Sequence, residues 1–308
     1  MKRIVLILVA VLVITGSVFG EGRLQSTSSQ KAALVFQTDF GLKDGAVSAM
    51  KGVAYGVDSR LFMADITHEI PPYSIWDAAY RLYQTAEYWP EGTVFVSVVD
   101  PGVGTERKSI VLRTNNNQYF VTPDNGTLTL IAEKYGISEI REIDEESNRL
   151  TGSEKSYTFY GRDVYAYTGA RLAAGILTFE NVGKKLPNEI VSLPYRKAEF
   201  RNGSLYGTIP ALDIQYGNVW TNIDRAVSAG FNLAINKNYL IEISYDNTVV
   251  YSGVIPFVNT FDDVPEGDPL MYYNSLDCLS FAINMDSFAD THGISYGGEW
   301  QVRISAVN

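Results

Sequence analysis

The sequence predicts an α/β protein with an N-terminal α/β sheet domain and a small C-terminal all-β domain, a barrel or alternatively a sandwich. From Ala33 to about Asn188, short apolar runs alternate with amphipathic stretches, as an α/β sheet requires. From about Val191, short β-type runs are instead separated by Gly, Asn and Asp. The segment from Pro187 to Pro194 is the expected linker. We therefore expect domains at residues 33–188 and 195–308.

The elements of the first domain follow from apolar periodicity. Its strand candidates are Leu34 to Thr38, Leu61 to Asp65, Thr93 to Val99, Ile110 to Arg113 and Tyr119 to Thr122. Its helix candidates are Gly45 to Val57, Ile75 to Tyr88, Thr127 to Tyr135 and Arg162 to Gly175.

The elements of the second domain are short β runs between turn residues. The candidates are Leu205 to Ile209, Val219 to Thr221, Tyr239 to Tyr245, Val249 to Val254, Leu270 to Tyr273 and Trp300 to Ser305. Asp246-Asn247 lies between two of these runs and predicts a hairpin turn.

The first twenty residues predict a secretory signal peptide. Lys2 and Arg3 precede an apolar stretch that begins at Ile4, and small residues follow from Gly16 to Gly20. Counted from Ile4 through Phe19, the apolar region is about 16 residues, shorter than the roughly 20 that span a bilayer, so cleavage is favoured over an uncleaved membrane anchor. We expect an exported protein, periplasmic or extracellular, with no membrane segment after cleavage.

Charge and composition exclude several classes of partner and site. The chain carries 35 acidic and 25 basic residues, a formal net charge of −10, and such a surface repels nucleic acid and anionic lipid. Cys278 is the only cysteine, so no internal disulfide can form, and its apolar neighbours predict a buried inert thiol. His68 and His292 are the only histidines, so a histidine-rich zinc site is not available.

The segment from Val99 to Arg107 is the most informative part of the chain. It places Asp100 and Arg107 around a glycine-rich turn at the carboxyl end of a predicted strand, where open α/β sheets bind ligands. It lacks the third glycine of a dinucleotide fingerprint and the Gly-Lys-Ser/Thr of a phosphate loop. The alternative is an ordinary Pro-Gly turn with a solvated arginine.

Acidic residues recur at the ends of predicted strands in this domain. They are Asp39, Asp65, Asp100 and Asp124. Each alone is typical of a turn or a helix cap, but several acids at one edge of a sheet indicate a site.

Six motifs in order resemble the S-adenosyl-L-methionine (SAM) hydroxide adenosyltransferases, which share a fold with the fluorinase and chlorinase enzymes. The resemblance extends over nearly all of the chain from Leu34 to Arg303. The motifs are Thr38-Asp39-Phe40-Gly41, Asp65-Ile66-Thr67-His68, Asp100 to Arg107, Pro123-Asp124-Asn125-Gly126, Phe159-Tyr160-Gly161-Arg162-Asp163 and Gly217-Asn218-Val219-Trp220-Thr221-Asn222.

The resemblance implies a homotrimer whose SAM site lies between the first domain of one subunit and the second domain of a neighbour. It assigns the ribose hydroxyls to Asp39, which suits a carboxylate because it can accept from both hydroxyls of a cis-diol. The other implied ligand contacts are Tyr73 and Phe261 as aromatic walls, Trp220 in its motif, Asp213 and Asn218 for the methionine ammonium and adenine, and Ser275 for the carboxylate. For the three aromatic residues, core packing is the alternative.

The reaction class follows from three positions of the resemblance. Asp100 and Arg107 match two of the residues that surround the attacking water in the hydroxide-using members, whereas the halogenases carry Tyr in place of that Asp. The third residue, His in the hydrolases, is Tyr160 here, as in the halogenases. A phenol is a poor base at neutral pH but can hydrogen-bond water, so Asp100 would carry the base or orienting role. Gly161 follows the hydrolase and chlorinase pattern, which leaves room but no hydroxyl donor.

Two further positions qualify the resemblance. Leu276 stands where the halogenases have an Arg for the methionine carboxylate, and His68 is expected to shape its turn rather than to catalyse. The leading hypothesis is an exported SAM hydrolase in which water attacks the ribose C5′ and gives adenosine and L-methionine, without cofactor or metal. The alternatives are a non-catalytic exported protein that binds adenosine or a related nucleoside and, less favoured, a SAM-dependent halogenase.

Overall fold

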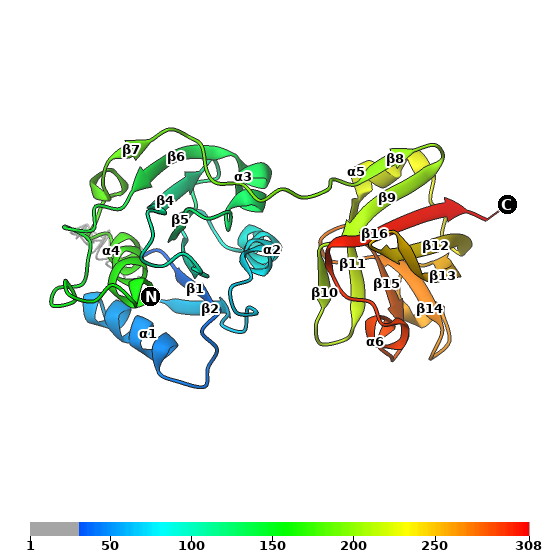
Figure 1. Cartoon of the computed structure of the whole chain (residues 1–308), viewed down its shortest axis with the longest axis horizontal. Helices are drawn as coiled ribbons and strands as arrows, with labels where there is room; N and C mark the ends of the chain where they lie inside the picture. The colour runs from blue at the N-terminus through cyan, green and yellow to red at the C-terminus, as the bar shows by residue number, and fades with distance from the viewer. Residues whose placement is uncertain (1–30, 308) are drawn as a thin grey trace, which may run out of the picture. The chain divides into compact units, whose positions relative to one another are not determined.

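The computed structural model describes residues 31–307, and the expected signal peptide, residues 1–20, lies outside this range. Within it, the strands form one sheet of seven strands and one of nine (Figure 1). The predicted combination of an α/β sheet domain and a mostly β domain is confirmed. No helix among residues 31–307 combines the length and the apolar character that crossing a membrane requires.

The first sheet has the strand order β2-β1-β3-β5-β4-β6-β7. The first four strands in this order are parallel, and β4, β6 and β7 are antiparallel to their neighbours. The bounds are β1 Leu34–Thr38, β2 Met63–Thr67, β3 Val94–Val98, β4 Ser109–Thr114, β5 Tyr119–Pro123, β6 Ile137–Glu142 and β7 Lys185–Leu186.

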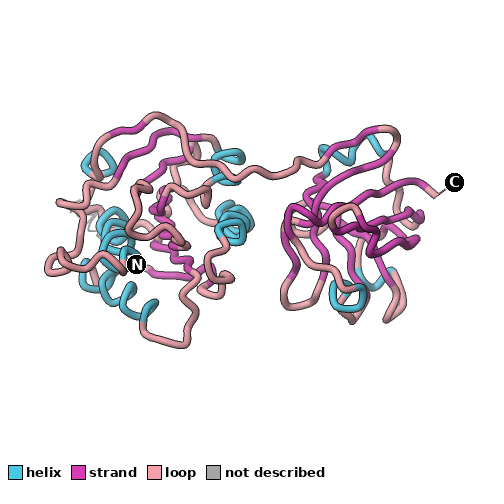
Figure 2. The backbone as a smooth tube through the Cα atoms, viewed as in Figure 1, coloured by secondary structure: helices cyan, strands magenta, loops and turns pink. Residues whose placement is uncertain are grey.

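Helices cover both faces of this sheet (Figures 1 and 2). Leu34 and Phe36 point into a core shared with α1 and α4, whereas Val35 between them packs in a core with α2 and α3. This alternation is the period-two pattern of a strand, and because both faces are buried, the central strands β1 and β3 are mostly apolar. The helix bounds are α1 Ala46–Val57, α2 Ile75–Thr85, α3 Thr129–Tyr135 and α4 Tyr167–Ala173.

The connections place a switch point between β1 and β3. From β1 the chain crosses to β2 on one side, and β3 then pairs with the other side of β1. In a parallel sheet, such a reversal of strand order opens a crevice at the carboxyl ends of the two strands. Asp39 follows β1 and Asp100 follows β3, so the topology brings these two acids to the same crevice.

The second sheet is largely antiparallel and has the order β10-β11-β15-β14-β13-β12-β16-β9-β8. Near its two ends, Thr208 of β9 donates its backbone N–H to the side chain of Asn222 in β11, at 2.8 Å, so the sheet curls around its own core as a barrel. The bounds are β8 Glu199–Arg201, β9 Ser204–Ile209, β10 Ala211–Asp213, β11 Asn218–Asp224, β12 Lys237–Tyr245, β13 Thr248–Phe257, β14 Pro269–Tyr273, β15 Cys278–Ile283 and β16 Gly297–Ala306.

Most predicted elements are present, with some corrections. The predicted hairpin at Asp246-Asn247 is confirmed, since both residues have positive φ (45° and 64°), as a type I′ turn requires. The strand expected at Leu61 to Asp65 is instead β2, two residues later, because Leu61 belongs to the preceding turn. Asp65 therefore lies inside a strand and not at its end. The sequence reasoning missed the short strands β7, β8 and β10, the longer β6 and the fully buried β15.

Candidate functional site

Asp100 and Arg107 form a nearly buried, bidentate ion pair in the loop between β3 and β4. Arg107 Nε lies 3.1 and 3.0 Å from the two carboxylate oxygens of Asp100, and its Nη2 lies 2.6 Å from Oδ2. The side chains are only 6% and 11% exposed. The bidentate contact between the guanidinium and the carboxylate therefore holds both side chains in one orientation. Arg107 is not the solvated arginine of an ordinary turn.

Tyr160 lies beside the same guanidinium. The Cζ of Arg107 is 4.8 Å from the centre of the Tyr160 ring, and Nη1 of Arg107 donates to Ser109 at 3.3 Å. Burial is the largest single influence on the pKa of Arg107 and lowers it, but the hydrogen bonds to Asp100 and the charge interactions with Asp100, Tyr160 and Tyr165 together outweigh burial, so the net direction is upward. The structure thus brings together the three residues predicted to be catalytic, around a guanidinium that stays charged.

A second arginine approaches Tyr160, and sequence reasoning missed it. The Cζ of Arg149 is also 4.8 Å from the Tyr160 ring centre, and its Nη2 donates to Glu145 at 2.6 Å. The other oxygen of Glu145 accepts from Ser109 at 3.3 Å, which closes a ring of polar contacts back to Arg107. The i,i+4 spacing of Glu145 and Arg149 is compatible with their ion pair, but it gives no signal of the contact with Tyr160.

Gly161 opens a π-helical turn, Gly161–Ala166, that precedes α4. A Cβ on Gly161 would lie 3.1 Å from the ring of Phe40, so glycine lets the loop after β1 approach this turn closely. Phe40 in turn packs edge-to-face on Phe159, with ring centres 5.9 Å apart. The sequence predicted an ordinary helix from Arg162, but the first turn of this segment is a wider π-helical turn. Such turns occur frequently at functional sites.

Asp39 is oriented by the backbone of Tyr73. The N–H of Tyr73 donates to Oδ2 of Asp39 at 2.9 Å, and within residues 31–307 Oδ1 of Asp39 accepts no hydrogen bond. Tyr73 has a positive φ of 68° and a side chain that is 72% exposed. The predicted ribose ligand therefore keeps one oxygen open, and the predicted aromatic wall is not buried in the core.

His68 has the structural role that the sequence predicted. Its Nδ1 lies 2.8 Å from Oγ1 of Thr38, its Nε2 lies 3.1 Å from Asp65, and its backbone carbonyl accepts from the N–H of Gly41 at 2.7 Å. These contacts join the ends of β1 and β2 and shape the turn that carries Asp39.

Five predicted ligand residues line one cavity of about 780 Å³ in the second domain. They are Asp213, Asn218, Trp220, Phe261 and Ser275. The cavity also contains Tyr272, whose ring lies 5.1 Å from that of Phe261 and whose pKa is raised to about 12, chiefly by burial, so the phenol stays neutral. The cavity volume lies in the range typical of small-molecule sites.

The turn between β10 and β11 positions two of these cavity residues, Asp213 and Asn218. The N–H of Gly217 donates to the carbonyl of Asp213 at 2.8 Å, and Nδ2 of Asn218 donates to Oδ2 of Asp213 at 3.3 Å. Gly217 has φ of 66° and faces Ser287 so closely that a Cβ would overlap that side chain. Trp220 also packs in an apolar cluster with Tyr80 and Leu130. It therefore lines the cavity and contributes to core packing as well.

The predicted site residues thus form two sets in one chain. Asp39, Tyr73, Asp100, Arg107, Tyr160 and Gly161 belong to the first domain, and the five cavity residues belong to the second. No hydrogen bond or ion pair among residues 31–307 joins one set to the other. The chain brings the catalytic candidates together in the first domain and Asp213, Asn218, Trp220, Phe261 and Ser275 together in the second, but Tyr73 lies apart from the other aromatic candidates, and the two sets are not joined directly.

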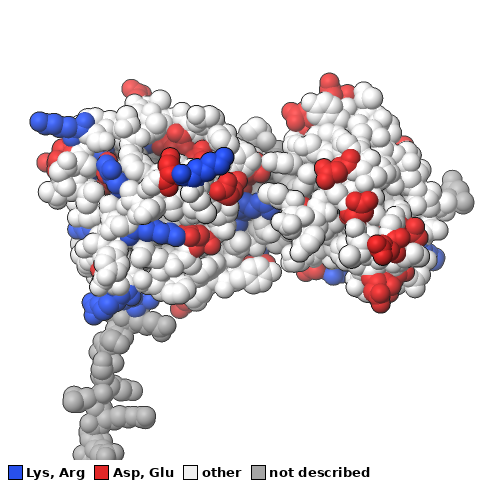
Figure 3. All heavy atoms as spheres, turned by 90° about the horizontal axis from the view of Figure 1, so that it is seen from below, with Lys and Arg blue, Asp and Glu red and all other residues white. Residues whose placement is uncertain are grey.

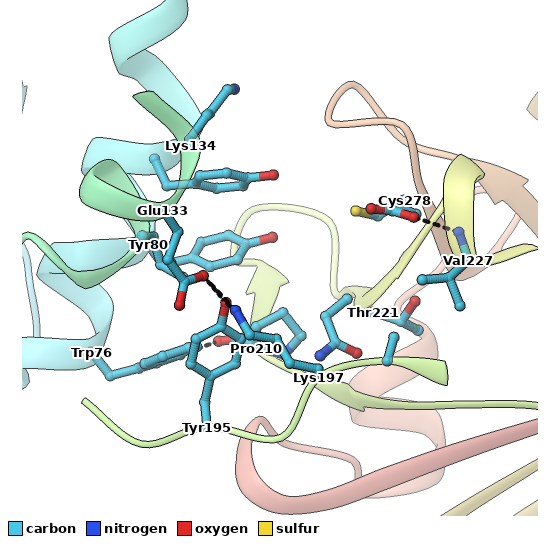
Figure 4. A pocket seen from close by; sticks show the side chains of 15 residues that line it. Trp76, Tyr80, Glu133, Lys134, Tyr195, Lys197, Pro210, Thr221, Val227 and Cys278 are labelled. Atoms are coloured by element: carbon cyan, nitrogen blue, oxygen red, sulfur yellow. Dashed lines mark hydrogen bonds and ion pairs between the residues drawn. The ribbon is translucent and has the colours of Figure 1, made fainter. Parts of the chain in front are cut away.

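A different pocket of about 360 Å³ contains none of the predicted site residues (Figure 4). Its walls include the aromatic side chains of Trp76, Tyr80 and Tyr195, and Lys197 contacts Glu133 there. Cys278 also borders it, and burial raises the pKa of this thiol to about 12, in agreement with the inert thiol predicted. In the part of the chain that the structure describes, no three His, Cys, Asp or Glu side chains are grouped to hold a metal ion.

Comparison with known families identifies the chain. The SAM hydroxide adenosyltransferase N-terminal domain matches residues 34–183, and the C-terminal domain of the same family matches residues 207–301. The fold and the site define a class of two-domain protein. Its first domain is an α/β sheet with an acid–arginine pair at the switch point, and its second domain is mostly β. The chain belongs to the SAM hydroxide adenosyltransferase family, which confirms the resemblance found in its motifs.

Several relatives match most of the chain. An (R)-S-adenosyl-L-methionine hydrolase of Thermus thermophilus is 31% identical over 268 residues, 85% of this chain and 96% of that protein. A fluorinase of Actinopolyspora mzabensis is 29% identical over 299 residues, 88% of this chain and 97% of that protein. A crystal structure of an uncharacterized conserved protein from Thermotoga maritima superposes with a TM-score of 0.82 at 34% identity and covers 88% of this chain and 99% of that one.

Proposed function

We propose that this protein hydrolyses SAM to adenosine and L-methionine. The observation that carries the proposal is the buried Asp100–Arg107 pair, with Tyr160 against the same guanidinium, at the switch point of the first sheet. Relatives of both kinds, hydrolase and fluorinase, agree with a reaction at SAM. The acid at position 100 favours water over halide, because a carboxylate beside the nucleophile repels an anion and accepts a hydrogen bond from water.

The proposed chemistry is an in-line displacement. The oxygen of water forms a bond to the ribose C5′ while the C5′–S bond breaks, and the electron pair of that bond goes to sulfur, which leaves as the neutral thioether of methionine. The attacking water loses one proton, through Asp100 or to solvent. A sulfonium is already a good leaving group, so the protein contributes mainly by positioning the water and the ribose.

Each catalytic candidate has one task in this scheme. Asp100 accepts a hydrogen bond from the water, and Arg107 fixes the carboxylate by gripping both its oxygens. Tyr160 supplies a hydroxyl that can hydrogen-bond the same water, and the guanidinium groups of Arg107 and Arg149, each 4.8 Å from its ring centre, restrict its position. Oδ1 of Asp39 remains open to a ribose hydroxyl.

We also propose that the working form is a homotrimer with each site shared between neighbouring subunits. The support is the division of the candidate residues between two domains and the apolar side chains left exposed beside each set. Near Asp39, Leu42 is 66% exposed and Tyr73 is 72% exposed. In the cavity of the second domain, Ile214 is 74% exposed and Met285 is 80% exposed. Light scattering that shows a monomer with full affinity for adenosine would contradict this arrangement.

Export is a further part of the proposal. It rests on the basic start and apolar stretch of residues 1–20. Expression of the full chain in a bacterial host, followed by fractionation and N-terminal sequencing of the exported form, tests it. Protein that stays cytoplasmic with Met1 intact would argue against export.

The decisive experiment for function is product analysis. Purified protein lacking residues 1–20 is incubated with SAM in water enriched in oxygen-18, with and without chloride. We expect adenosine that carries the heavy oxygen at C5′, together with methionine. A 5′-chloro-5′-deoxyadenosine product would support the halogenase alternative. Tight binding of adenosine without any turnover would support the nucleoside-binding alternative, which the Tyr160 substitution motivates.

A further inference from the structure

We propose that the site prefers a 5′-adenosyl sulfonium that ends in an amine and lacks a carboxylate. This inference rests on the proposed hydrolase function and specifies its substrate class. It comes from the charges of the second-domain cavity, the one that holds Asn218, Trp220 and Phe261. Among its lining residues are three carboxylates, Asp213, Asp286 and Asp290, and no Lys, Arg or His.

No cation of the described chain neutralises these carboxylates. Among residues 31–307, none of the three takes part in an ion pair. Asp213 accepts from the neutral amide of Asn218 at 3.3 Å, and Asp286 accepts from the backbone N–H of Ser287 at 2.7 Å. Figure 3 shows one face of the molecule on which acidic side chains outnumber basic ones over the second domain. The cavity is therefore a region of negative potential next to aromatic walls.

This potential acts differently on the two charged ends of the SAM amino-acid tail. An ammonium has three donors and finds carboxylate acceptors in the cavity, so its entry is favoured. A carboxylate must approach like charges and give up its hydration, so its entry is disfavoured. The sulfonium itself is a cation and gains from the same field.

The residues that line the cavity offer a substrate carboxylate only neutral donors. Ser275, the position expected for that contact, provides a neutral hydroxyl. Leu276 beside it packs against an apolar cluster with Trp220, and its backbone N–H is already donated to Asn274 at 2.8 Å. A neutral hydroxyl is a poor replacement for the guanidinium fork that usually grips a carboxylate.

The substrate that this inference expects to be preferred over SAM is therefore an S-adenosyl alkylamine. Its hydrolysis keeps the balance given above: the oxygen of water bonds to C5′, the C5′–S bond breaks with its electron pair going to sulfur, and one proton is released. The products are adenosine and an aminoalkyl thioether. No oxidant or reductant is needed.

The test compares SAM with decarboxylated SAM (S-adenosyl-3-methylthiopropylamine) as substrates of the same assembled protein. We expect kcat/KM for decarboxylated SAM to be higher by about tenfold or more, since each 1.4 kcal/mol of discrimination is about a factor of ten. The double variant Asp286→Asn/Asp290→Asn should reduce this ratio, and Ser275→Lys should reverse it. A kcat/KM for SAM that equals or exceeds the other overturns the inference.

Two controls separate this inference from its alternatives. Lys43, an exposed cation in the loop after β1, is changed to Gln. A rise in KM for SAM alone in Lys43→Gln would show that the first domain supplies a carboxylate anchor, and would overturn the inference. If neither compound yields adenosine, the proposed hydrolase function has failed, and calorimetric Kd values of the two sulfonium compounds still decide the charge preference.

Discussion

The two sets of candidate residues differ in how their polar groups are occupied. In the first domain, Asp100 is gripped by Arg107 and belongs to a closed network with Ser109 and Glu145. In the second domain, the carboxylates of the cavity have no cationic partner among residues 31–307. A site that must hold a water in line needs groups fixed beforehand, whereas a site that must recognise a cation needs acceptors that are still free. The comparison assigns chemistry to the first set and recognition to the second.

The first-domain set, whose polar groups already hold one another, is called the fixed set below, and the second-domain set, whose acceptors are free, is called the recognition set. The largest effect should come from disrupting the fixed set at Asp100. Asp100→Asn keeps the shape of the side chain but replaces an acceptor oxygen with a donor, so the water loses its orientation. We expect kcat for SAM hydrolysis to fall by about 10²–10⁴, with adenosine affinity unchanged. Glu106→Gln is the matched control, because it removes the same charge from an exposed residue of the same loop.

Adenosine release is measured for Asp100→Asn and for the control Glu106→Gln. Thermal unfolding of Asp100→Asn checks that the unpaired Arg107 has not disrupted the fold. Equal release by the parent and Asp100→Asn would mean that the water is oriented elsewhere. The assignment of chemistry to the first domain would then be wrong.

A second, smaller effect should follow at Asp39, the recognition residue of the first domain. Asp39→Ala removes the charged acceptor for ribose hydroxyls, at about 1.5–3 kcal/mol for each hydrogen bond lost. We expect the Kd for adenosine to rise at least about tenfold by calorimetry. Glu91→Ala is the control, since Glu91 is an exposed acid that precedes β3 at the opposite edge of the sheet. Unchanged affinity in Asp39→Ala would remove this residue from the site.

Local sequence patterns predicted the acids of the first domain but not the neighbours that fix them, for a physical reason. Asp39 and Asp100 follow buried parallel strands, and the carboxyl ends of such strands meet at one edge, so their proximity follows from local patterns. Their neighbours Glu145 and Arg149 lie in a segment without regular secondary structure, and only the tertiary fold brings them to Tyr160. No local pattern reports such a contact.

The errors in the predicted strands have similar causes. Asp65 was expected at a strand end because Leu61 was counted into the strand, but the apolar run alone does not show where pairing with β1 begins. The strand β15 was missed because its apolar run, Cys278–Ile283, cannot be distinguished by periodicity from a buried helical segment and has fewer β-branched residues than the predicted strand β3. The cavity charges of Asp286 and Asp290 come from a turn and a short helix, α6 Phe288–His292, that adjoin β15.

A third prediction concerns Tyr160, where the fixed set departs from the hydrolase motif. In Tyr160→His, the nearby guanidinium groups of Arg107 and Arg149 should disfavour the imidazolium, which leaves a neutral imidazole that can accept a proton from water. We expect kcat to rise several-fold, with activity lost on acidification at or below about pH 6.5, the ordinary imidazole pKa.

The measurement is kcat against pH for Tyr160→His, Tyr160→Phe and the parent. Tyr160→Phe is the control, because it keeps the ring and removes the hydroxyl. If the parent and Tyr160→His both release no adenosine, the fixed set does not catalyse and the nucleoside-binding alternative gains support.

The smallest effect should appear in the recognition domain, at His292 at the end of α6. Its ring packs on those of Tyr251 and Phe288, with centres 4.5 and 4.6 Å away, and burial lowers its pKa. The folded state therefore binds this proton less readily than the unfolded state, whose imidazole titrates near pH 6.5 or so. The contribution of neutral His292 to the free energy of unfolding is fully present above that pH. It declines as the pH falls below that value and levels off below the pKa of the folded state.

Urea unfolding of the parent and His292→Gln at pH 7.5 and pH 5.5 measures this contribution. The parent should lose more free energy of unfolding than the variant between the two pH values, by less than the 1.4 kcal/mol or so that a full pKa unit would give. Because α6 also carries Asp290, adenosine affinity measured at the same two pH values shows whether a weakened helix disturbs the cavity. An identical pH dependence in the parent and His292→Gln would show that this histidine does not couple the recognition domain to pH.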